Sequence, residues 1–286
     1  MEAQLHDARL CKLGEGPLWH PEREQLFWFD ILAQKLLSRR GEETLEWNFD
    51  RPVSAAAWID HDTLLIAGAG TLMRFDVTSG HREQICPLES DRPGNRSNDG
   101  RADPWGGFWI GTMGRSAEPG AGAIWRYYRG ELRELFGSIT IPNSISFTPD
   151  GRFAHFSDTH ERLVWRQRLG KGGWPTGEPE IYLDLRAQKT NPDGAVCDAE
   201  GFLWLACWGN SHIARYTPDG HCHTKLALPV EQPSCPAFGG ADFTTLYVTS
   251  ARDGLQPKEE ALLTMDGATF SFNAGVSGLR EPSVTL

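Results

Sequence analysis

Short runs of apolar and aromatic residues alternate with polar turns along the whole chain. Six stretches share this form, each a polar turn followed by a short apolar run: REQLFWFD, DTLLIAGA, GGFWIGTM, GRFAHFSD, GFLWLACW and TTLYVTSA. Long helical periodicity is nearly absent, and the 31 glycines and 18 prolines are scattered along the chain. Short apolar runs bounded by turn residues are typical of β-strands, so the pattern predicts an all-β protein with many turns.

The six stretches recur at a nearly regular interval. One apolar residue in each, here called its anchor, gives the series Leu26, Leu64, Phe108, Phe153, Phe202 and Leu246. Successive anchors are 38, 44, 45, 49 and 44 residues apart, and a hairpin-like stretch follows each one. Four-stranded units at a period of about 40–50 residues are typical of β-propellers. The sequence therefore predicts a six-bladed β-propeller of four-stranded blades. A β-sandwich or two small barrels are the alternatives, although they have no such longer period.

No internal linker interrupts the series, so we predict a single propeller domain over residues 1–286. We expect the segment before Glu15 to supply a strand to the last blade and so to close the ring. The first residues of the chain contain no apolar segment of signal-peptide length, and no run approaches the length of a membrane span. We therefore predict a cytoplasmic protein.

Charge and cysteine content narrow the possible partners. The 38 acidic and 28 basic residues give a net charge of −10. This charge disfavours nucleic acid and anionic membranes as partners, because both need a basic protein surface. The six cysteines form no C-x-x-C pair, so we expect reduced and mostly buried thiols. Nothing in the sequence points to a protein partner, whereas a cation or a neutral small molecule is compatible with it.

Polar residues that precede the anchors by nine to eleven positions form a set. In a propeller, equivalent positions of different blades converge at one mouth of the central channel. Counting back from four anchors leads to Glu15 in LGEGPLW, Asn98 in RSNDGRADP, Asn143 in IPNSISF and Asp193 in NPDGAVCDAEG. The other two anchors lead back to Val53 and Cys235, which are not hard ligands. The set predicts carboxylate and carboxamide oxygens at one channel mouth.

Turn chemistry is the competing explanation for these residues. The stretch Asn191-Pro192-Asp193-Gly194 looks like a tight turn, and Asp, Asn, Gly and Pro are ordinary turn residues. Glu15 has no turn role, however, and four matches at one repeat position favour a convergent site. Two carboxylates with amide oxygens, and with no His or Cys, suit Ca²⁺, Mg²⁺ or Mn²⁺ rather than a structural Zn²⁺ site. Glu15 and Asp193 facing each other would repel without a cation between them.

Six stretches distributed from residue 13 to near the C-terminus resemble the gluconolactonase/regucalcin family of senescence-marker-protein-like six-bladed propellers. They are LGEGPLW, RSNDGRADPWGGFWIGTM, IPNSISFTPDGRFAHFSDT, NPDGAVCDAEGFLWLACWG, CPAFGGADFTTLYVTSA and GVSGLREP. The resemblance implies one divalent metal ion held by Glu15, Asn143 and Asp193. Ca²⁺ is the first choice, and Mg²⁺, Mn²⁺ or Zn²⁺ are alternatives. The resemblance also implies that Arg96 and Asn98 bind the substrate.

The family's enzymes hydrolyse sugar lactones to aldonic acids, so the resemblance implies a sugar lactonase, a carboxylic ester hydrolase of carbohydrate metabolism. Gluconolactone or a pentonolactone would be the substrate. We expect a metal-polarised lactone carbonyl with Asp193 as the general base, while Asp99 braces its turn. A non-catalytic calcium-binding regulatory propeller and a hydrolase of other esters or organophosphates remain open. The intact Arg96 and Asn98 favour an enzyme, because a calcium buffer needs no substrate-binding arm.

Motifs for other catalytic classes are absent or weak. No G-x-S-x-G or H-E-x-x-H occurs in the chain. The stretch His221-Cys222-His223 follows TPDG, so we expect it in an exposed hairpin turn. The sequence contains 11 tryptophans. We expect most of them in the core or the channel wall, including Trp28, Trp109, Trp204 and Trp208.

Two loops are expected to decide which sugar is bound. Loop 114–122 carries Arg115, and loop 186–191 carries Arg186 and Lys189. These basic side chains leave room for an anionic substituent on the sugar lactone.

Overall fold

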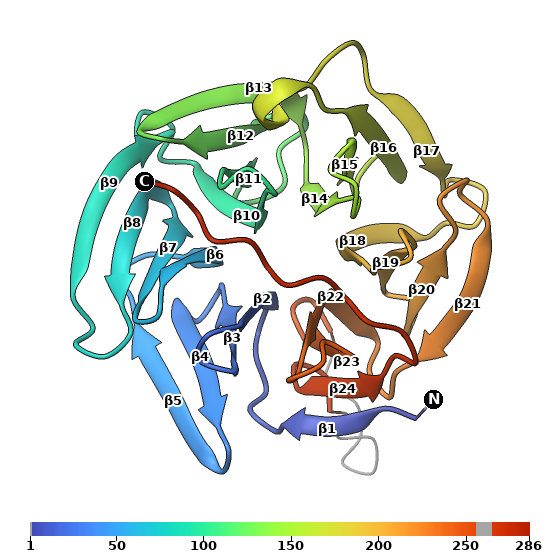
Figure 1. The fold of residues 1–286 in the computed structure, drawn as a ribbon, viewed down its shortest axis with the longest axis horizontal. Coiled ribbons are helices and arrows are strands. Elements are labelled where there is room, and N and C mark those ends of the chain that lie inside the picture. Colours follow the sequence, from blue (N-terminus) through green and yellow to red (C-terminus); the bar gives the residue numbers. More distant parts are fainter. Residues whose placement is uncertain (1, 256–264) are drawn as a thin grey trace.

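Six four-stranded antiparallel sheets stand around a central axis in the computed structural model, which describes residues 2–255 and 265–286 (Figure 1). The predicted six-bladed β-propeller of four-stranded blades is confirmed. A single turn of 3₁₀-helix, η1 (Lys171–Gly173), is the only helical element in the described residues. No helix in this part of the chain is long and apolar enough to span a membrane.

Each blade runs from an innermost strand at the axis to an outermost strand at the rim. Blade 1 is formed by β2 (Gly14–His20), β3 (Gln25–Asp30), β4 (Lys35–Arg40) and β5 (Glu43–Asn48). Blade 2 is formed by β6 (Val53–Asp60), β7 (Thr63–Gly68), β8 (Gly70–Asp76) and β9 (Arg82–Leu88). Blade 3 is formed by β10 (Asn95–Ala102), β11 (Phe108–Gly114), β12 (Gly122–Tyr128) and β13 (Glu131–Ile139). Blades 4 and 5 are formed by β14 (Pro142–Phe147), β15 (Phe153–Asp158), β16 (Leu163–Arg168) and β17 (Glu180–Asp184), and by β18 (Asn191–Cys197), β19 (Leu203–Trp208), β20 (His212–Tyr216) and β21 (Cys222–Ala227).

The last blade joins the two ends of the chain. It contains β22 (Gln232–Gly239), β23 (Thr245–Ala251), β24 (Thr269–Asn273) and, as its outermost strand, β1 (Gln4–Asp7). Strand β1 pairs antiparallel with β24, with Gln4 opposite Ser271 and Leu5 opposite Phe270. The expected closure of the ring by the segment before Glu15 is thereby confirmed.

The burial of each strand follows its distance from the axis. Strands β2 and β22 are buried at every position, because neighbouring blades cover both of their faces. The rim strand β5 alternates between exposed and half-buried positions, as expected for a strand with one face toward solvent. The core lies between blades, where Phe27 and Phe29 of blade 1 pack with Ile66 and Phe75 of blade 2. Most of the tryptophans expected in the core, Trp28, Trp109 and Trp204, are fully buried.

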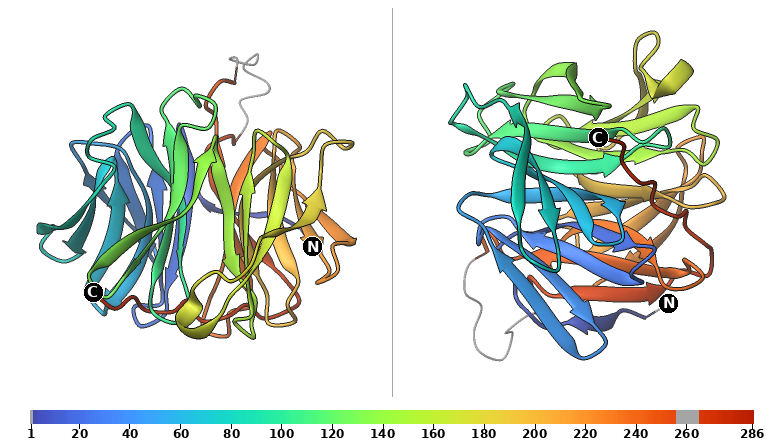
Figure 2. Two further views of the ribbon diagram at one scale, coloured as in Figure 1. Left: turned by 90° about the horizontal axis from the view of Figure 1, so that it is seen from above. Right: turned by 60° about the vertical axis from the view of Figure 1, so that its left-hand side comes forward.

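The C-terminal segment closes one end of the channel. Residues 274–286 cross the face of the propeller that is turned toward the viewer in Figure 1 and lie along the lower edge of the left view in Figure 2. Glu281 of this segment forms a buried ion pair with Arg101 of β10. Arg101 also donates to the backbone carbonyls of Ile145, Ala195 and Pro236, on the innermost strands of blades 4, 5 and 6. One guanidinium of blade 3 therefore ties its own blade to three others and to the C-terminal segment.

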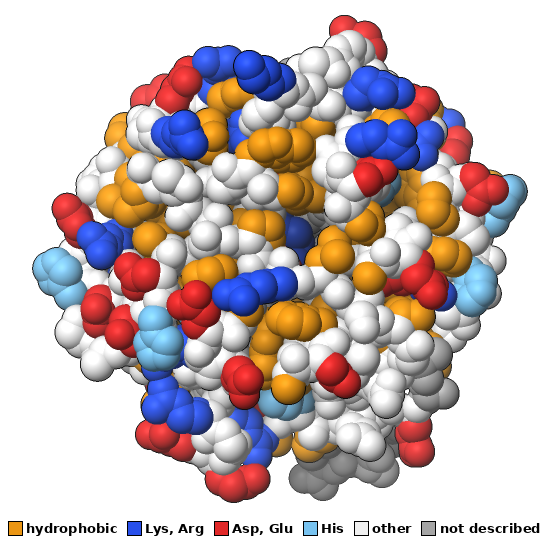
Figure 3. Space-filling model, in the orientation of Figure 1, with side chains coloured by type: hydrophobic (Ala, Val, Ile, Leu, Met, Phe, Trp, Pro, Cys, Tyr) orange, Lys and Arg blue, Asp and Glu red, His pale blue; other side chains and the backbone are white. Residues whose placement is uncertain are grey.

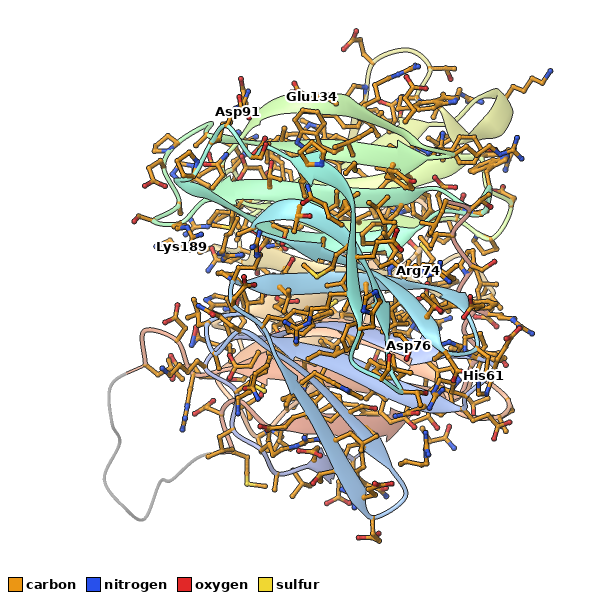
Figure 4. All side chains as sticks on the ribbon, turned by 90° about the vertical axis from the view of Figure 1, so that its left-hand side faces the viewer. His61, Arg74, Asp76, Asp91, Glu134 and Lys189 are labelled. Carbon is orange, nitrogen blue, oxygen red and sulfur yellow. The ribbon has the colours of Figure 1, made fainter. Side chains whose placement is uncertain are left out.

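The two faces of the propeller differ as a result. On the closed face, hydrophobic side chains gather around the centre together with a few Lys or Arg side chains, and most of the charged side chains of both signs lie toward the rim (Figure 3). His61 lies on this side of the molecule, whereas Lys189 lies on the opposite side (Figure 4). The innermost strands begin at the opposite mouth, where the residues counted back from the anchors are found.

Breaking the buried ion pair should destabilise the whole ring. E281A would leave the Arg101 charge buried and unpaired, a change that typically costs about 3–5 kcal/mol. The double variant R101M/E281L removes the unpaired charge but also the donors to three buried carbonyls, so it should recover only part of that loss. Urea unfolding followed by tryptophan fluorescence measures both.

Lys35 and Glu46 provide the matched control, because they form a partly exposed ion pair on blade 1. E46A should change the stability by less than about 1 kcal/mol. Equal losses in E281A and E46A would contradict the role assigned to Arg101.

Candidate active site at the open mouth of the channel

A break in strand register occurs near the start of every innermost strand. The pairing with the second strand shifts between Glu15 and Leu18, and at the corresponding places in the other five blades: Val53/Ala55, Ser97/Gly100, Asn143/Ser146, Pro192/Ala195 and Pro233/Pro236. A β-bulge bends its strand and re-aims the side chains beside it. The four polar residues found by counting back from the anchors lie at these bulges or immediately before them.

The local sequence suits this irregular backbone. Gly16 follows Glu15 with φ +54°, and a Cβ there would lie only 2.2 Å from the carbonyl oxygen of Ser54 in the next blade. Only glycine fits such a position. Ser144 follows Asn143 with φ +60°, and its hydroxyl donates to the carbonyl of Asp193 at 2.6 Å. The bulges therefore serve both to aim the side chains and to join neighbouring blades.

One detail of the sequence prediction is wrong. The stretch Asn191-Pro192-Asp193-Gly194 is the start of strand β18 and not a tight turn. The anchors lie in the second strand of each blade or, for Phe202, immediately before it. The count still reached the channel mouth, because the second strand pairs antiparallel with the innermost one.

A pocket of about 210 Å³ opens at this mouth. All five residues predicted for the site line it, together with six that were not predicted: Leu13, Met113, Ile141, Thr159, Trp208 and Asp253. Val53 and Cys235 are not among the lining residues. Trp208 is only half-buried there, unlike the other tryptophans expected in the core.

A signal for part of the missed set was present in the repeat. Met113, Thr159 and Trp208 follow their anchors by five or six positions, Phe108, Phe153 and Phe202 respectively. The second strand of each blade ends at the mouth where the innermost strand begins. Counting forward along the second strand reaches the same pocket as counting back along the first.

Hydrogen bonds fix the polar side chains of the pocket. Arg96 Nη1 donates to the carbonyl of Ser97 at 2.9 Å and to Asn98 Oδ1 at 2.7 Å. Asn98 Nδ2 donates to the carbonyl of Pro142 at 3.0 Å and to Asn143 Oδ1 at 2.9 Å. The residues expected to bind substrate are thus bonded directly to one of the residues expected to bind metal.

Serine hydroxyls tie the blades together at the same level. Ser54 of blade 2 donates to the carbonyl of Asn98 in blade 3, and Ser234 of blade 6 donates to the carbonyl of Gly14 in blade 1. Asp99, which we expected to brace its own turn, instead accepts a hydrogen bond from the backbone N–H of Ile145 in blade 4 at 2.8 Å. These contacts fix the positions of the blades around the pocket.

The buried carboxyl groups of the pocket are strongly perturbed. Burial, and then the charge of Asp99, raise the pKa of Glu15 to about 8. Burial and the neighbouring charges of Glu15 and Asp99 raise the pKa of Asp193 well above its usual value. Burial alone raises the pKa of Asp99 to about 6 against its hydrogen bonds. The pKa of Arg96 falls to about 10, because its burial outweighs the attraction of Glu15. Three acidic groups therefore share one desolvated space.

This donor set fits a hard divalent cation. Glu15 and Asp193 supply carboxylates, Asn143 supplies a carboxamide oxygen, and no His or Cys lines the pocket. Within the described residues, no group of three or more His, Cys, Asp or Glu could hold a metal. The set at the mouth is of a different kind, because it combines only two carboxylates with one carboxamide. Because the two carboxylates carry raised pKa values, a cation between them would relieve the cost of ionising both.

Comparison with known proteins identifies the family. Residues 13–252 match the family model described as SMP-30/Gluconolactonase/LRE-like region. The chain belongs to this family. The predicted family is thereby confirmed.

Members of the SMP-30/gluconolactonase family resemble the chain along nearly its whole length. It is 41% identical over 278 residues to a Rhizobium meliloti protein named "Putative sugar lactone lactonase", covering 96% of this chain and 94% of that one. It is 30% identical to a 6-deoxy-6-sulfogluconolactonase of Pseudomonas putida, with 94% of each chain covered. The crystal structure of a calcium-binding protein, regucalcin, from Agrobacterium tumefaciens matches with a TM-score of 0.94 at 40% identity, over 99% of this chain and 97% of that one.

The remaining predictions fall outside the pocket. All six cysteines are free, and four of them are buried. His221, Cys222 and His223 are exposed at the β20–β21 hairpin, as expected. Arg186 is held by an ion pair with Asp184 at 2.5 Å, so its guanidinium is already engaged.

The raised pKa of Glu15 predicts how the metal-free protein responds to pH. Its folded pKa of about 8 lies above the ordinary value of 4.5. The unfolded chain therefore releases this proton first as the pH rises, and stability falls between about pH 4.5 and pH 8. E15Q removes the group, so its melting temperature in chelator should exceed the wild-type value by an amount that grows from pH 5 to pH 8.5.

E134Q is the matched control, because Glu134 is an exposed carboxylate on the rim strand β13 (Figure 4). Its melting curves should follow the wild-type curves at every pH. A constant difference between E15Q and wild type across this range would show that Glu15 ionises normally in the fold.

Proposed function

We propose that this chain is a metal-dependent sugar lactonase that opens a lactone ring to the aldonic acid in the pocket of the open mouth. The enzyme class agrees with the relatives, which include an L-arabinolactonase of Azospirillum brasilense that is 35% identical to this chain. The observation that carries the proposal is that Glu15, Asn143, Asp193, Arg96 and Asn98, from four different blades, line one pocket. The pocket is smaller than the ~300–1,000 Å³ of drug-sized ligand sites, which suits a single sugar ring.

Glu15, Asn143 and Asp193 would hold the cation, for which Ca²⁺ is our first choice. When bound, the cation would supply positive charge that polarises the lactone carbonyl and stabilises negative charge on its oxygen. Side chains of the protein would transfer the proton and orient the substrate. The pocket removes the reacting ring from bulk water, which strengthens every electrostatic interaction inside it.

Asp193 is the residue we assign as general base. Its carboxylate would take a proton from the water that attacks the lactone carbonyl carbon. The ring C–O bond would then break, and Asp193 would return this proton to the ring oxygen, which leaves as a hydroxyl. Desolvation raises the pKa of this carboxyl group in the metal-free protein, whereas a bound cation would lower it, so the basicity of Asp193 would be set by these two opposing effects. Its backbone is held by Ser144 from the neighbouring blade, so the carboxylate is aimed before substrate arrives.

Arg96 and Asn98 would orient the substrate. Both line the pocket and are hydrogen-bonded to each other. Guanidinium N–H groups suit lactone carbonyl and ring hydroxyl oxygens. Trp208, Met113 and Ile141 offer an apolar wall against which a sugar ring can lie. Polar groups at one side and apolar groups at the other are typical of sites for small ligands.

Removing the base or the cation should abolish turnover. D193A should lower kcat/KM for gluconolactone or a pentonolactone by about 10³-fold, within the range expected for loss of a general base. Chelator should abolish wild-type activity, and added Ca²⁺, Mg²⁺ or Mn²⁺ should restore it. Acid release under weak buffering measures the rate.

D219A is the control for D193A, because Asp219 is exposed in the turn before β21 and should leave activity unchanged. Near-full activity of D193A, or of the wild type in metal-stripped buffer, would exclude this mechanism.

The rim of the pocket favours a lactone that carries an anionic substituent. Arg115 directly follows β11 and is close enough to Arg96 to lower its pKa. Its side chain is exposed and forms no hydrogen bond or ion pair with any residue in the described part of the chain. Glu118 of the same loop is exposed and accepts the backbone N–H of Ser116. Arg115 is therefore a free positive charge that acts electrostatically on Arg96, whereas Arg186 is already paired.

Comparing an anionic lactone with a neutral one should reveal whether Arg115 contacts the substrate. R115A should lower kcat/KM about tenfold for a lactone with a carboxylate or sulfonate on its exocyclic carbon, the scale of one charge-assisted hydrogen bond. The neutral parent lactone should be hydrolysed as by wild type. R186A should leave both rates unchanged because its guanidinium is held by Asp184. Equal loss on neutral and anionic lactones would contradict an anion-binding role for Arg115.

A second candidate is a calcium-binding regulatory propeller without catalysis. It is favoured by the likeness to the Agrobacterium tumefaciens protein described as a calcium-binding protein, regucalcin. A hydrolase of other esters or organophosphates on the same site is the third. A panel of sugar lactones, simple esters and phosphotriesters, assayed with and without chelator, separates the three. Calcium binding without turnover of any substrate would favour the second.

A further inference from the structure

A single line of hydrogen bonds runs from blade 3 through blade 4 to blade 5 along the wall of the pocket. Arg96 donates to Asn98 Oδ1, and Asn98 Nδ2 donates to Asn143 Oδ1 at 2.9 Å. Asn143 Nδ2 donates to Thr159 Oγ1 at 2.8 Å. Thr159 Oγ1 then donates to the carbonyl oxygen of Pro192 at 2.6 Å. The line ends at the residue that precedes the candidate general base.

The two ends of this line fix its direction. A guanidinium can only donate, so Asn98 must turn its oxygen toward Arg96 and its nitrogen toward Asn143. A backbone carbonyl can only accept, so the one hydroxyl proton of Thr159 goes to Pro192. The oxygen of Thr159 is then left as an acceptor, and it can bond only to the nitrogen of Asn143.

The direction matters because the two ends of a carboxamide differ as ligands. The oxygen of Asn143 suits a hard cation, whereas its NH₂ group carries no lone pair for one. If the hydroxyl of Thr159 were absent, the buried nitrogen of Asn143 would lose its partner. The amide would then be held only at its oxygen, by Asn98, and its nitrogen would shift to find another acceptor. Partners of metal ligands that act in this way fix the orientation of the ligand.

We propose that Thr159 is a positioning residue for the cation site. It fixes the Asn143 carboxamide with its oxygen on the side of Asn98 and its nitrogen away from the cation, and it joins this ligand to the strand that carries Asp193. The inference rests on the metal set of the proposed function. Thr159 itself lines the pocket.

The turn that carries Thr159 is rigid enough for this role. The carboxylate of Asp158 accepts the backbone N–H groups of Thr140 at 2.7 Å, Ile141 at 3.0 Å and His160 at 3.1 Å. The backbone N–H of Thr159 donates to the carbonyl of Ile141 at 3.0 Å. The hydroxyl is therefore presented by a backbone that is fixed on both sides. The buried carboxylate of Asp158 therefore fixes the backbone of the turn through three hydrogen bonds.

Calcium affinity tests the proposal without reference to catalysis. Isothermal titration with calcium chloride should give a dissociation constant for T159V that is about 10–100-fold weaker than for wild type, the usual loss when a partner of a metal ligand is removed. T159S keeps the hydroxyl and should bind with nearly the wild-type affinity. The metal-free melting temperature of T159V should stay close to that of wild type, and T159A replaces it in the titration if it does not.

T71V is the matched control, because Thr71 is a buried threonine of β8 in blade 2 that does not line the pocket and whose hydroxyl donates to the carbonyl of Leu72 on the same strand. Its calcium affinity should equal the wild-type value. Wild-type affinity in T159V, or equal weakening in T159S and T159V, would overturn the positioning role of the hydroxyl while leaving the proposed function intact. Failure of the wild type to bind Ca²⁺, Mg²⁺ or Mn²⁺ would overturn the proposed metal dependence itself.

Discussion

The mouth of the channel holds two buried carboxyl groups that repel each other whenever both are ionised. Glu15 and Asp193 come from blades 1 and 5, and the pKa of each is raised by burial and by neighbouring acidic groups. Such a pair favours moving apart unless a proton or a cation compensates it. The rest of the fold must therefore hold the blades in place against this force. That requirement explains why the channel wall carries so many contacts between blades.

A ring meets this requirement because every blade is held from both sides. Strand β1 completes the last blade, so no blade has a free flank. Serine hydroxyls and Asp99 bond neighbouring blades at the level of the pocket. At the other end of the channel, Arg101 joins three innermost strands to the C-terminal segment through Glu281. At both ends of the channel, side chains of one blade donate hydrogen bonds to backbone carbonyls of another. Serine hydroxyls donate them at the open mouth, and the Arg101 guanidinium donates them at the closed end.

The repeated sequence stretches predicted the blades and most of the candidate site. The six anchors predicted the blades, and a count of nine to eleven residues back from four of them reached Glu15, Asn98, Asn143 and Asp193. The β-bulges could not be predicted, because a bulge depends on pairing with a strand of unknown register. Their sequence, rich in Gly, Asn and Pro, looks like a turn. Thr159 and Trp208 were missed because neither residue type signals a ligand; only their distance from the anchor does.

The division of the pocket between strands and loops also explains how one fold can serve several lactones. The residues assigned to the cation stand on innermost strands, whose buried bulges tolerate little change. Arg115 and Lys189 stand in loops outside these strands, and loops accept substitution more readily. Relatives that are named for 6-deoxy-6-sulfogluconolactone and L-arabinolactone are each at least 30% identical to this chain. On the proposed mechanism, a change of substrate would require new side chains in these loops, while the residues assigned to the cation would stay where the closed ring holds them.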